Sequence, residues 1–542
     1  MSAAESLQPA EPAGRPVGPP APGKPAVRSI LGLEYKWLVA IAVIFGLFMA
    51  VLDSTVVNIA LPKLQAVFGV TLNDIQWVVT AYTLAQTISV PLFGYLADRF
   101  GAKWIYMISL ALFTIASMLC GLSWNVSSMI FFRVLQGLGG GALLPLGIAQ
   151  VYAVFPPEQR GLSQATIGVP VLLAPALGPT FGGYIIQYFS WRIIFYLNVP
   201  IGIVGLFMCW VLLRRGRVNE RARLDIPGLV LATLAFSSLV YGVGEAASDG
   251  WSSARVLGFG TFGLICLVAL IVVELRTDDP LLDFSLYKRW NWSSAYLITI
   301  AITFALFGAL FLVPQYLQVL RGLNPEQAGL VLLPSSLVTL IALPLSGLAT
   351  DRFGPKWSIF IGLLALGLAS YLLSGLTLTT PIQVIQLLLI GRSIGIGFAS
   401  QPASVIALSD VPRAKLARGS AFFTLQRQVA AAFITSFLAT YVKDRTIPHF
   451  AHLAEQTTQA SPLYAYLSGV VAQAAAQGRW VLPVQAQLLR QVAIQLRLQA
   501  TVLAFRDALM LITGLIVVAF GLAFFVGNPR AGGGRASAEI ME

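Results

Sequence analysis

The chain has 542 residues, of which 57% are hydrophobic and 11% charged, and its mean hydropathy is +0.79. Soluble domains carry about 25% charged residues, so this composition excludes an ordinary soluble protein and indicates an all-α polytopic protein surrounded by a lipid bilayer. The net charge of +12 does not indicate nucleic-acid binding, because the basic residues lie in short blocks between apolar runs, the pattern that orients membrane helices.

Both ends of the chain are expected to be tails. Residues 1–34 are rich in Pro, Ala and Gly and cannot bury enough apolar surface to fold, which predicts a disordered cytoplasmic tail. The tail lacks the apolar core of a cleavable signal peptide, so the first span is expected to stay attached to it. Residues 528–542 are expected to form a second cytoplasmic tail.

Apolar windows long enough to cross a bilayer recur through the rest of the chain and predict about fourteen spans. They lie near 38–61, 76–97, 104–122, 128–152, 163–188, 194–213, 226–246, 256–275, 293–314, 328–350, 357–376, 382–408, 419–441 and 504–526.

Lys and Arg predict the orientation of these spans. With the N-terminus in the cytoplasm, sixteen Lys and Arg residues fall in the cytoplasmic connections and four in the short external ones. The positive-inside rule therefore predicts a multi-pass protein of the cell (inner) membrane with both termini in the cytoplasm.

The segment 442–503 is expected to be a long external loop. It contains both histidines of the chain, His449 and His452, and ends in a stretch of helix length from Val481 to Ala500. We interpret that stretch as an external cap that extends the last span; the alternative is a docking surface for a periplasmic adaptor protein. Two histidines without a nearby Cys or carboxylate cluster are a weak metal signal, so no metal site is predicted.

An eleven-residue cytoplasmic loop occurs twice. Residues 94–104 read GYLADRFGAKW and residues 347–357 read GLATDRFGPKW, with seven identities and no gap. The repeat predicts two six-helix bundles, 35–215 and 291–527, with two inserted transmembrane helices and a linker at 216–290, an arrangement of 6 + 2 + 6. We expect these loops to latch the two bundles together on the cytoplasmic side. The gating residues are Gly94, Asp98, Arg99, Gly101, Lys103, Gly347, Asp351, Arg352, Gly354 and Lys356.

The chemistry of the loop supports a latch. Gly94 permits close helix approach and Gly101 a tight turn. Asp98 can accept hydrogen bonds from a helix N-terminus or pair with Arg99 and Lys103 on adjoining elements. A plain positive-inside loop would need the basic residues, but neither the glycines nor the aspartate.

Asp53 is the acidic residue that lies well inside an expected span, where a carboxylate costs about 2.5–3.5 kcal/mol to insert. Removal from water favours the neutral form, so Asp53 is a candidate proton carrier; a structural hydrogen bond is the alternative. Arg133 in the fourth span cannot discard its charge, and we expect it to face Asp53. Arg392 occupies the corresponding place in the second half, and Arg427 is a third buried arginine; neither receives a role.

Three further motifs complete a resemblance. They are Leu52–Pro62 in the first span, Arg133-Val-Leu-Gln136-Gly137 in the fourth, and Gly178-Pro179-Thr-Phe-Gly182-Gly183 in the fifth. With the repeated loop, the chain resembles the fourteen-spanner drug–proton antiporter branch of the major facilitator superfamily over nearly all of residues 35–527. The resemblance implies a proton carrier at Asp53 and reads the fifth-span motif as a mark of exporters.

We therefore expect a proton-coupled secondary exporter of amphiphilic or hydrophobic small molecules that works by alternating access. Export of a lipid or a specific metabolite, or proton-coupled import, remains the alternative. No phosphate-binding GxxxxGK[ST] motif occurs, so no ATP or other cofactor is expected. An enzyme would need a nucleophile and a base within the spans, and both histidines lie outside them, so no enzymatic activity is expected. Candidates to line a mixed aromatic and amide substrate cavity are Tyr82, Gln86, Gln136, Phe304, Phe307 and Phe311; the alternative, favoured for the aromatic residues, is that they face lipid or the protein core.

Overall fold

The computed structural model describes residues 34–214, 225–277, 280–409, 411–412, 415–456, 469, 473, 476 and 481–527. The expected tails at 1–34 and 528–542 lie outside these residues, apart from Glu34. All the regular structure that is described is helical, as the composition predicts.

The first bundle consists of five long helices followed by a broken sixth. Its helices are α1 (Tyr35–Phe68), α2 (Leu72–Phe100), α3 (Ala102–Leu122), α4 (Val126–Val154), α5 (Arg160–Tyr188), α6 (Ile193–Tyr196) and α7 (Asn198–Leu212), with the 3₁₀ turn η1 (Pro157–Gln159) before α5.

Two inserted helices and a second bundle follow. The inserted pair is α8 (Ile226–Asp249) and α9 (Ala254–Glu274). The second bundle contains α10 (Trp290–Gln315), α11 (Pro325–Phe353), α12 (Pro355–Ser374), α13 (Ile382–Ser409), α14 (Leu416–Gln456) and α16 (Val481–Ala523). The short turns η2 (Phe284–Lys288) and η3 (Tyr316–Leu320) flank α10.

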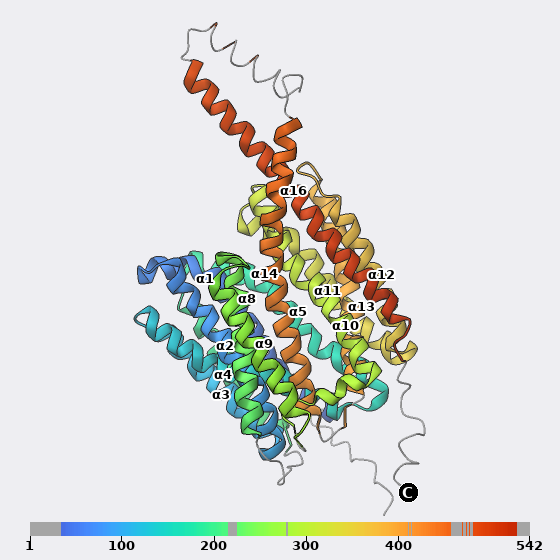
Figure 1. Ribbon diagram of the computed structural model, residues 1–542. Helices are drawn as coiled ribbons and strands as arrows, with labels where there is room; N and C mark the ends of the chain where they lie inside the picture. The colour runs from blue at the N-terminus through green and yellow to red at the C-terminus, as the bar shows by residue number, and fades with distance from the viewer. Residues whose placement is uncertain are drawn as a thin grey trace, which may run out of the picture.

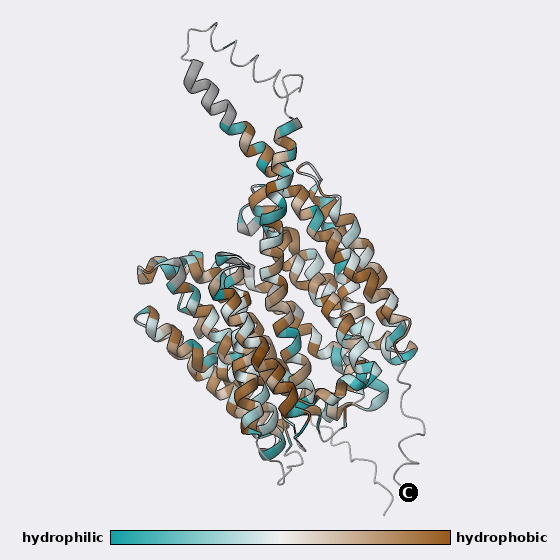
Figure 2. Ribbon diagram, in the orientation of Figure 1, coloured by the Kyte–Doolittle hydropathy of each residue, from teal (hydrophilic) through white to brown (hydrophobic). Residues whose placement is uncertain are grey.

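Eleven helical segments of the described residues are long and apolar enough to cross a membrane. Three more helices, α2, α5 and α14, have 29, 29 and 41 residues, enough length for a span; α2 and α14 are more polar, and the side chains of several residues within α5 lie outside what the structure describes. Each of the fourteen expected windows coincides with a helix, while the count of fourteen membrane crossings stays a prediction. Apolar residues predominate along the helices of both bundles (Figure 2).

The second helix of each bundle begins with the same device. Thr71 caps α2 and exchanges hydrogen bonds with Asp74, and Asn324 caps α11 and exchanges them with Gln327. Each capping box satisfies two backbone donors that a helix start would otherwise leave unpaired. Both boxes lie the same number of residues before the repeated loop, so the internal repeat extends along the whole helix.

The repeated loop itself is a single sharp turn. Gly101 joins α2 to α3 with φ of 94°, and Gly354 joins α11 to α12 with φ of 90°. Side chains with a Cβ rarely adopt this region, so glycine is required at both turns.

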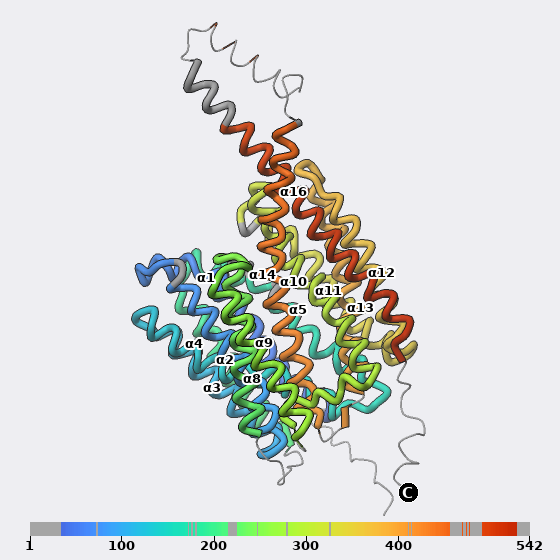
Figure 3. Tube along the Cα trace, viewed as in Figure 1, coloured from blue at the N-terminus to red at the C-terminus, as the bar shows by residue number. Residues whose placement is uncertain are grey.

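The segment 442–503 is less of a loop than expected. Helix α14 continues to Gln456 and α16 begins at Val481, so the described residues of this segment are largely extensions of the last two spans (Figure 3). The helix expected from Val481 to Ala500 is continuous with the last span, as the cap interpretation predicts. Residues 442–456 and 481–503 are thus helical, and the chain between them lies outside the described residues, apart from residues 469, 473 and 476.

The two bundles meet at one end and diverge toward the end from which α14 and α16 extend (Figure 1). The contacts between bundles pair α2 with α14, α4 with α14, and α5 with α11. The repeated loops lie at the end where the bundles meet, and we call the contact of α2, α4 and α5 with α11, α13 and α14 the seam.

Candidate functional site

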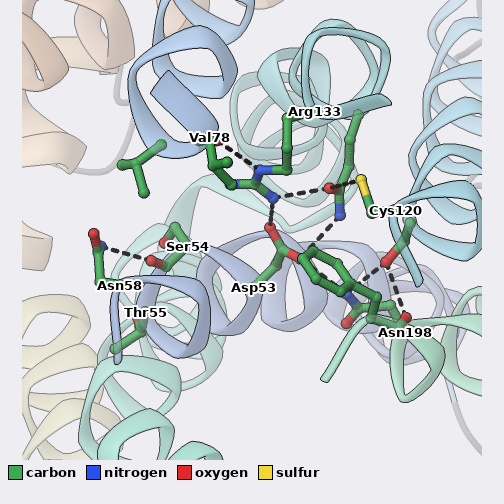
Figure 4. Close-up of polar contacts among 12 residues, drawn as sticks. Asp53, Ser54, Thr55, Asn58, Val78, Cys120, Arg133 and Asn198 are labelled. Atoms are coloured by element: carbon green, nitrogen blue, oxygen red, sulfur yellow. Dashed lines mark hydrogen bonds and ion pairs between the residues drawn. The ribbon is translucent and has the colours of Figure 1, made fainter. Parts of the chain in front are cut away.

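Asp53 lies in α1 at the centre of a buried polar cluster, with 2% of its surface exposed (Figure 4). Nη1 of Arg133 in α4 donates to Oδ2 of Asp53 at 2.5 Å. Oδ1 of the same carboxylate accepts from Gln136 Nε2 at 2.9 Å and from Asn198 Nδ2 at 3.1 Å. Three helices, α1, α4 and α7, therefore meet on one carboxylate.

Arg133 is fully buried and is held from several sides. Its Nε donates to the Val78 carbonyl of α2 at 3.0 Å, and its Nη1 also donates to Gln136 Oε1 at 2.8 Å. The guanidinium carbon lies 4.0 Å from the centre of the Tyr82 ring, a favourable cation–π geometry. Among the described residues, the Nη2 atom of Arg133 has no hydrogen-bond partner.

The three side chains that contact the carboxyl group of Asp53 are all hydrogen-bond donors. One of the three hydrogen bonds comes from a guanidinium and is charge-assisted. A proton on either oxygen would occupy an accepting position and remove the negative charge that Arg133 faces. Protonation would thus weaken the link between α1, α4 and α7 at one point.

The expected contact of Arg133 with Asp53 is present, but two further partners of the carboxylate were missed. Gln136 was expected to line a substrate cavity; it is buried and bridges Asp53 and Arg133. Asn198 received no role, although an amide near the start of the sixth span is a signal of a buried hydrogen bond. It donates to Asp53 and also to the hydroxyl of Ser117 in α3.

The structure does not gather the expected cavity residues into one place. Tyr82, like Gln136, belongs to the Asp53 cluster, and its hydroxyl is buried without a partner among the described residues. Gln86 is half-buried in α2, and its backbone carbonyl faces Gly141 of α4.

The three expected aromatic residues lie instead on α10 of the second bundle. All three are half-buried and pack against the core. The ring of Phe304 meets that of Phe437 in α14 edge to face, with 6.4 Å between the ring centres. Whether these rings line a substrate path remains a prediction.

Arg392 in α13 matches Arg133 in position but not in partner. Its Nη2 donates to the Ala305 carbonyl of α10 at 2.5 Å and to the Leu306 carbonyl at 3.3 Å. Backbone oxygens therefore replace the carboxylate in the second bundle, which agrees with the absence of an aspartate from the corresponding part of α10.

The first repeated loop contacts the second bundle through an ion pair. Asp98 Oδ2 lies 2.8 Å from Nε of Arg418 in α14, and the two side chains are 11% and 7% exposed. Asp98 thus pairs across the seam with Arg418, a residue that the sequence offered only as one of many cytoplasmic basic residues. Lys103, expected as a partner of Asp98, donates instead to the Trp210 carbonyl of α7 at 2.8 Å.

The second repeated loop contacts the first bundle through a helix N-terminus. Asp351 accepts from the backbone N–H groups of Gly161 at 2.7 Å and Leu162 at 3.0 Å, in the first turn of α5. This is the helix-terminus contact expected of the motif, and the helix dipole favours a negative charge there. Lys356 donates to the Phe524 carbonyl at 2.7 Å, so the lysines of both loops hold carbonyls of their own bundle.

The glycines of the motif allow these contacts. A Cβ added at Gly94 would lie 3.3 Å from Cβ of Ala421 in α14, and one added at Gly347 would lie 2.8 Å from Cβ of Ala165 in α5. Beside the first contact, the hydroxyl of Ser420 in α14 donates to the Pro145 carbonyl of α4 at 2.9 Å. The seam between the bundles is therefore closely packed at the end that carries the repeated loops.

The inserted helices are attached to this seam. Glu274 at the end of α9 is 2% exposed and accepts from the backbone N–H of Leu282 at 3.2 Å. Arg418, the partner of Asp98, also donates to the Pro280 carbonyl at 3.2 Å. The same arginine thus contacts the first bundle and the linker that follows the inserted pair.

The fifth-span motif packs α5 on α1. A Cβ at Gly178 would meet Thr55 at 2.7 Å and one at Gly182 would meet Val56 at 2.9 Å, both on α1 close to Asp53. Gly183 has open space beside it, and the side chain of Pro179 lies outside what the structure describes.

The histidines do not assemble a metal site. Within the described residues, no group of three or more His, Cys, Asp and Glu side chains could hold a metal ion. Nε2 of His449 in α14 lies 2.8 Å from Asp507 Oδ2 in α16, which also accepts from Arg445 at 2.9 Å. These contacts join the two long helices.

Comparisons with known proteins agree with this arrangement. Residues 43–435 match the family model "Major Facilitator Superfamily". The chain is 37% identical to an uncharacterized MFS-type transporter, YhcA, of Bacillus subtilis (strain 168), over 79% of this chain and 81% of that one. It is 31% identical to the multidrug export protein EmrB of Escherichia coli (strain K12), over 92% and 96%. A riboflavin transporter, RibZ, of Clostridioides difficile (strain 630) is 30% identical over 76% and 89%.

Solved structures share the fold. The human organic anion transporter MFSD10 superposes with a TM-score of 0.56 at 14% identity, covering 90% of this chain and 99% of that one. The proton:xylose symporter XylE superposes with a TM-score of 0.55 at 14% identity, covering 92% and 97%.

Proposed function

Because this chain belongs to the major facilitator superfamily, whose members are transporters driven by ion gradients without a cofactor, we propose that it is a proton-coupled exporter of amphiphilic or hydrophobic small molecules. The chain is a multi-pass membrane protein and not an enzyme. The multidrug exporter of E. coli that it matches over almost its whole length supports export as the direction.

The observation that carries the proposal is the buried pair of Asp53 and Arg133. Asp53 is a carboxylate that can bind and release a proton within the membrane, and its loss of charge alters contacts among three helices. One proton that moves down 100 mV supplies about 2.3 kcal/mol, enough for roughly a fifty-fold substrate gradient.

Alternating access supplies the link between proton and substrate. With the termini and the repeated loops in the cytoplasm, the contacts of Asp98 with Arg418 and of Asp351 with α5 close the cytoplasmic side. In this state Asp53 is held by Arg133, Gln136 and Asn198, and it is the group that accepts a proton from outside. Protonation loosens the first bundle, the seam opens, and substrate enters from the cytoplasm as the proton leaves.

The test is dye-induced proton release in reconstituted vesicles with an imposed pH gradient. Ethidium and dansyl-aminoundecanoic acid serve as amphiphilic probes of opposite charge. Native protein is expected to exchange protons for at least one dye, and Asp53→Asn is expected to abolish the exchange. Asp249→Asn, at an exposed ion pair with Arg255, is the matched control and is expected to behave as native. Unchanged exchange in Asp53→Asn would contradict the role of Asp53.

The same vesicles separate export from its alternative. Uptake of a specific metabolite has a precedent in the name of the related riboflavin transporter, which does not state a direction. If the imposed proton gradient drives riboflavin in the direction of proton flow, and neither dye in the opposite direction, the chain is an importer.

We further propose that the outward extensions of α14 and α16 dock a periplasmic adaptor protein. Both helices continue past the bundles and are joined by Asp507, His449 and Arg445. Replacing residues 457–496 by a short linker is expected to preserve dye export in vesicles and to lower dye resistance of whole cells. Equal effects in vesicles and cells would contradict the docking role.

A further inference from the structure

Arg427 in α14 is a permanent cation that no described residue neutralises. It makes no hydrogen bond or ion pair with any residue in the described part of the chain. The side chain is half-buried, eleven residues from the start of a helix of 41 residues, roughly 16 Å along its axis. An arginine at such depth in a membrane costs at least about 2.5–3.5 kcal/mol, and it cannot lose its charge.

The other buried arginines show what is missing. Arg133 pairs with Asp53, Arg418 pairs with Asp98, and Arg392 donates to two backbone carbonyls of α10. Each of these charges has a fixed acceptor within the protein. The buried aspartates are engaged elsewhere: Asp53 and Asp98 with arginines, and Asp351 with the first turn of α5.

Arg427 lies on the face of α14 that meets the first bundle. It follows Ser420 by seven residues, and Thr424 lies between them at helical spacing, so the three share one face. Ser420 donates to the Pro145 carbonyl of α4, which fixes the direction of that face. Arg427 is about 10 Å further along α14, in the direction in which the bundles diverge (Figure 1).

The surroundings suit a molecule with one charged end. The next turn of α14, from Val429 to Ala432, is Val-Ala-Ala-Ala, which is apolar and carries small side chains. A guanidinium presents planar, paired donors that fit a carboxylate, sulfonate or phosphate. An anion with an apolar body could place its charge on Arg427 and its body along this turn.

We propose that Arg427 binds the anionic group of the transported substrate, so that organic anions with an apolar body are the preferred cargo. This inference rests on the proposed transport function and deepens it by naming the substrate class. The anionic group of the substrate supplies the acceptor that Arg427 lacks among the described residues. In its absence, the same charge attracts organic anions into the seam between the bundles.

The test measures binding rather than transport. The probes are dansyl-aminoundecanoic acid and its methyl ester, which share the apolar body and differ in charge. Binding to the purified full-length protein in neutral detergent is followed by dansyl fluorescence. Native protein is expected to bind the acid more tightly than the ester. Arg427→Gln is expected to weaken binding of the acid about tenfold or more and to leave the ester unchanged, because a hydrogen-bonded charge pair is lost. Arg427→Lys is expected to fall between the two.

Arg255→Gln is the control, because it removes one positive charge from an exposed ion pair outside the seam. A native preference for the acid that disappears in Arg427→Gln, is reduced in Arg427→Lys and persists in Arg255→Gln supports the site. Equal binding of acid and ester by native protein, or equal weakening of both by Arg427→Gln, would overturn the proposal. A loss of folding in Arg427→Gln is recognised by its melting curve, and Arg427→Lys then decides between the same outcomes.

The two proposals fail separately. If the acid binds through Arg427 but no probe is exchanged for protons in vesicles, the anion site stands and proton-coupled export does not. If ethidium is exported in exchange for protons while acid and ester bind alike, export stands and the anion site does not.

Discussion

Nη1 of Arg133 lies 2.5 Å from Oδ2 of Asp53, and both side chains are almost completely inaccessible to solvent. A buried ion pair of this kind is costly to break from one side, because the remaining charge has no water to solvate it. The pair therefore links the protonation of one carboxylate to the packing of two helices.

Arg133→Gln is expected to lower stability by about 3–5 kcal/mol, because Asp53 is left as an unpaired buried charge. The double variant Asp53→Asn/Arg133→Gln is expected to recover a large part of this loss, because neither charge remains. Thermal unfolding of the four proteins of this double-mutant cycle in one detergent measures the coupling. Additive effects of the two single changes would show that the pair does not act as a unit.

A disulfide across the seam is expected to block transport. The Cβ positions of Gly94 and Ala421 are 3.3 Å apart, close to the 3.5–4.5 Å that a disulfide requires. Oxidised Gly94→Cys/Ala421→Cys should lose dye exchange and regain it on reduction. Gly94→Cys alone is the control for the added side chain. Undiminished exchange in the oxidised protein would show that the seam need not open.

The two repeated loops are expected to differ in their sensitivity to charge. Asp98→Asn removes an ion pair with Arg418, whereas Asp351→Asn keeps an oxygen that can accept from the first turn of α5. Loosening of the seam should therefore be greater in Asp98→Asn. The measurement is the labelling rate of a cysteine introduced at Ser420, which the closed seam buries. Faster labelling in Asp351→Asn than in Asp98→Asn would reverse this ranking.

Glu274→Ala is expected to detach the inserted pair from its linker. Loss of the carboxylate leaves the Leu282 N–H without its acceptor and empties a buried position, at a cost of about 1–3 kcal/mol. Glu274→Gln keeps an accepting oxygen and should cost less. Melting temperatures of both variants, compared with Glu245→Ala, a change at a partly exposed ion pair with Arg255, test the link. Equal melting of Glu274→Ala and native protein would show that the contact adds nothing.

Much of the fold followed from hydropathy and one repeat, because lipid forces long apolar helices and duplication repeats their order. The pairing of Asp53 with Arg133 was predictable, since two opposite charges in neighbouring spans have few other ways to be satisfied. Asn198 was not, because an amide can also bond its own backbone and lies 145 residues from Asp53 in sequence. Arg418 was one of many basic residues near helix ends, and only the packing of α2 on α14 selects it.

Helix α14 contacts both bundles and the inserted pair, through α2, α4, α8, α10, α13 and α16. It holds Arg418 at the seam, Arg427 in mid-course, and His449 beyond the bundles, within one rod of 41 residues, about 60 Å long. Its middle also donates from Ser436 and Thr440 to carbonyls of α8. Pro448 lies inside α14 and is a point at which the helix can bend, but over the roughly 48 Å before it a tilt of about 10° at the seam displaces the helix by roughly 8 Å. The position of the outer end of α14 therefore depends on the tilt of the helix at the seam. In the proposed alternating-access cycle, that position differs between the state open to the cytoplasm and the state open to the outside.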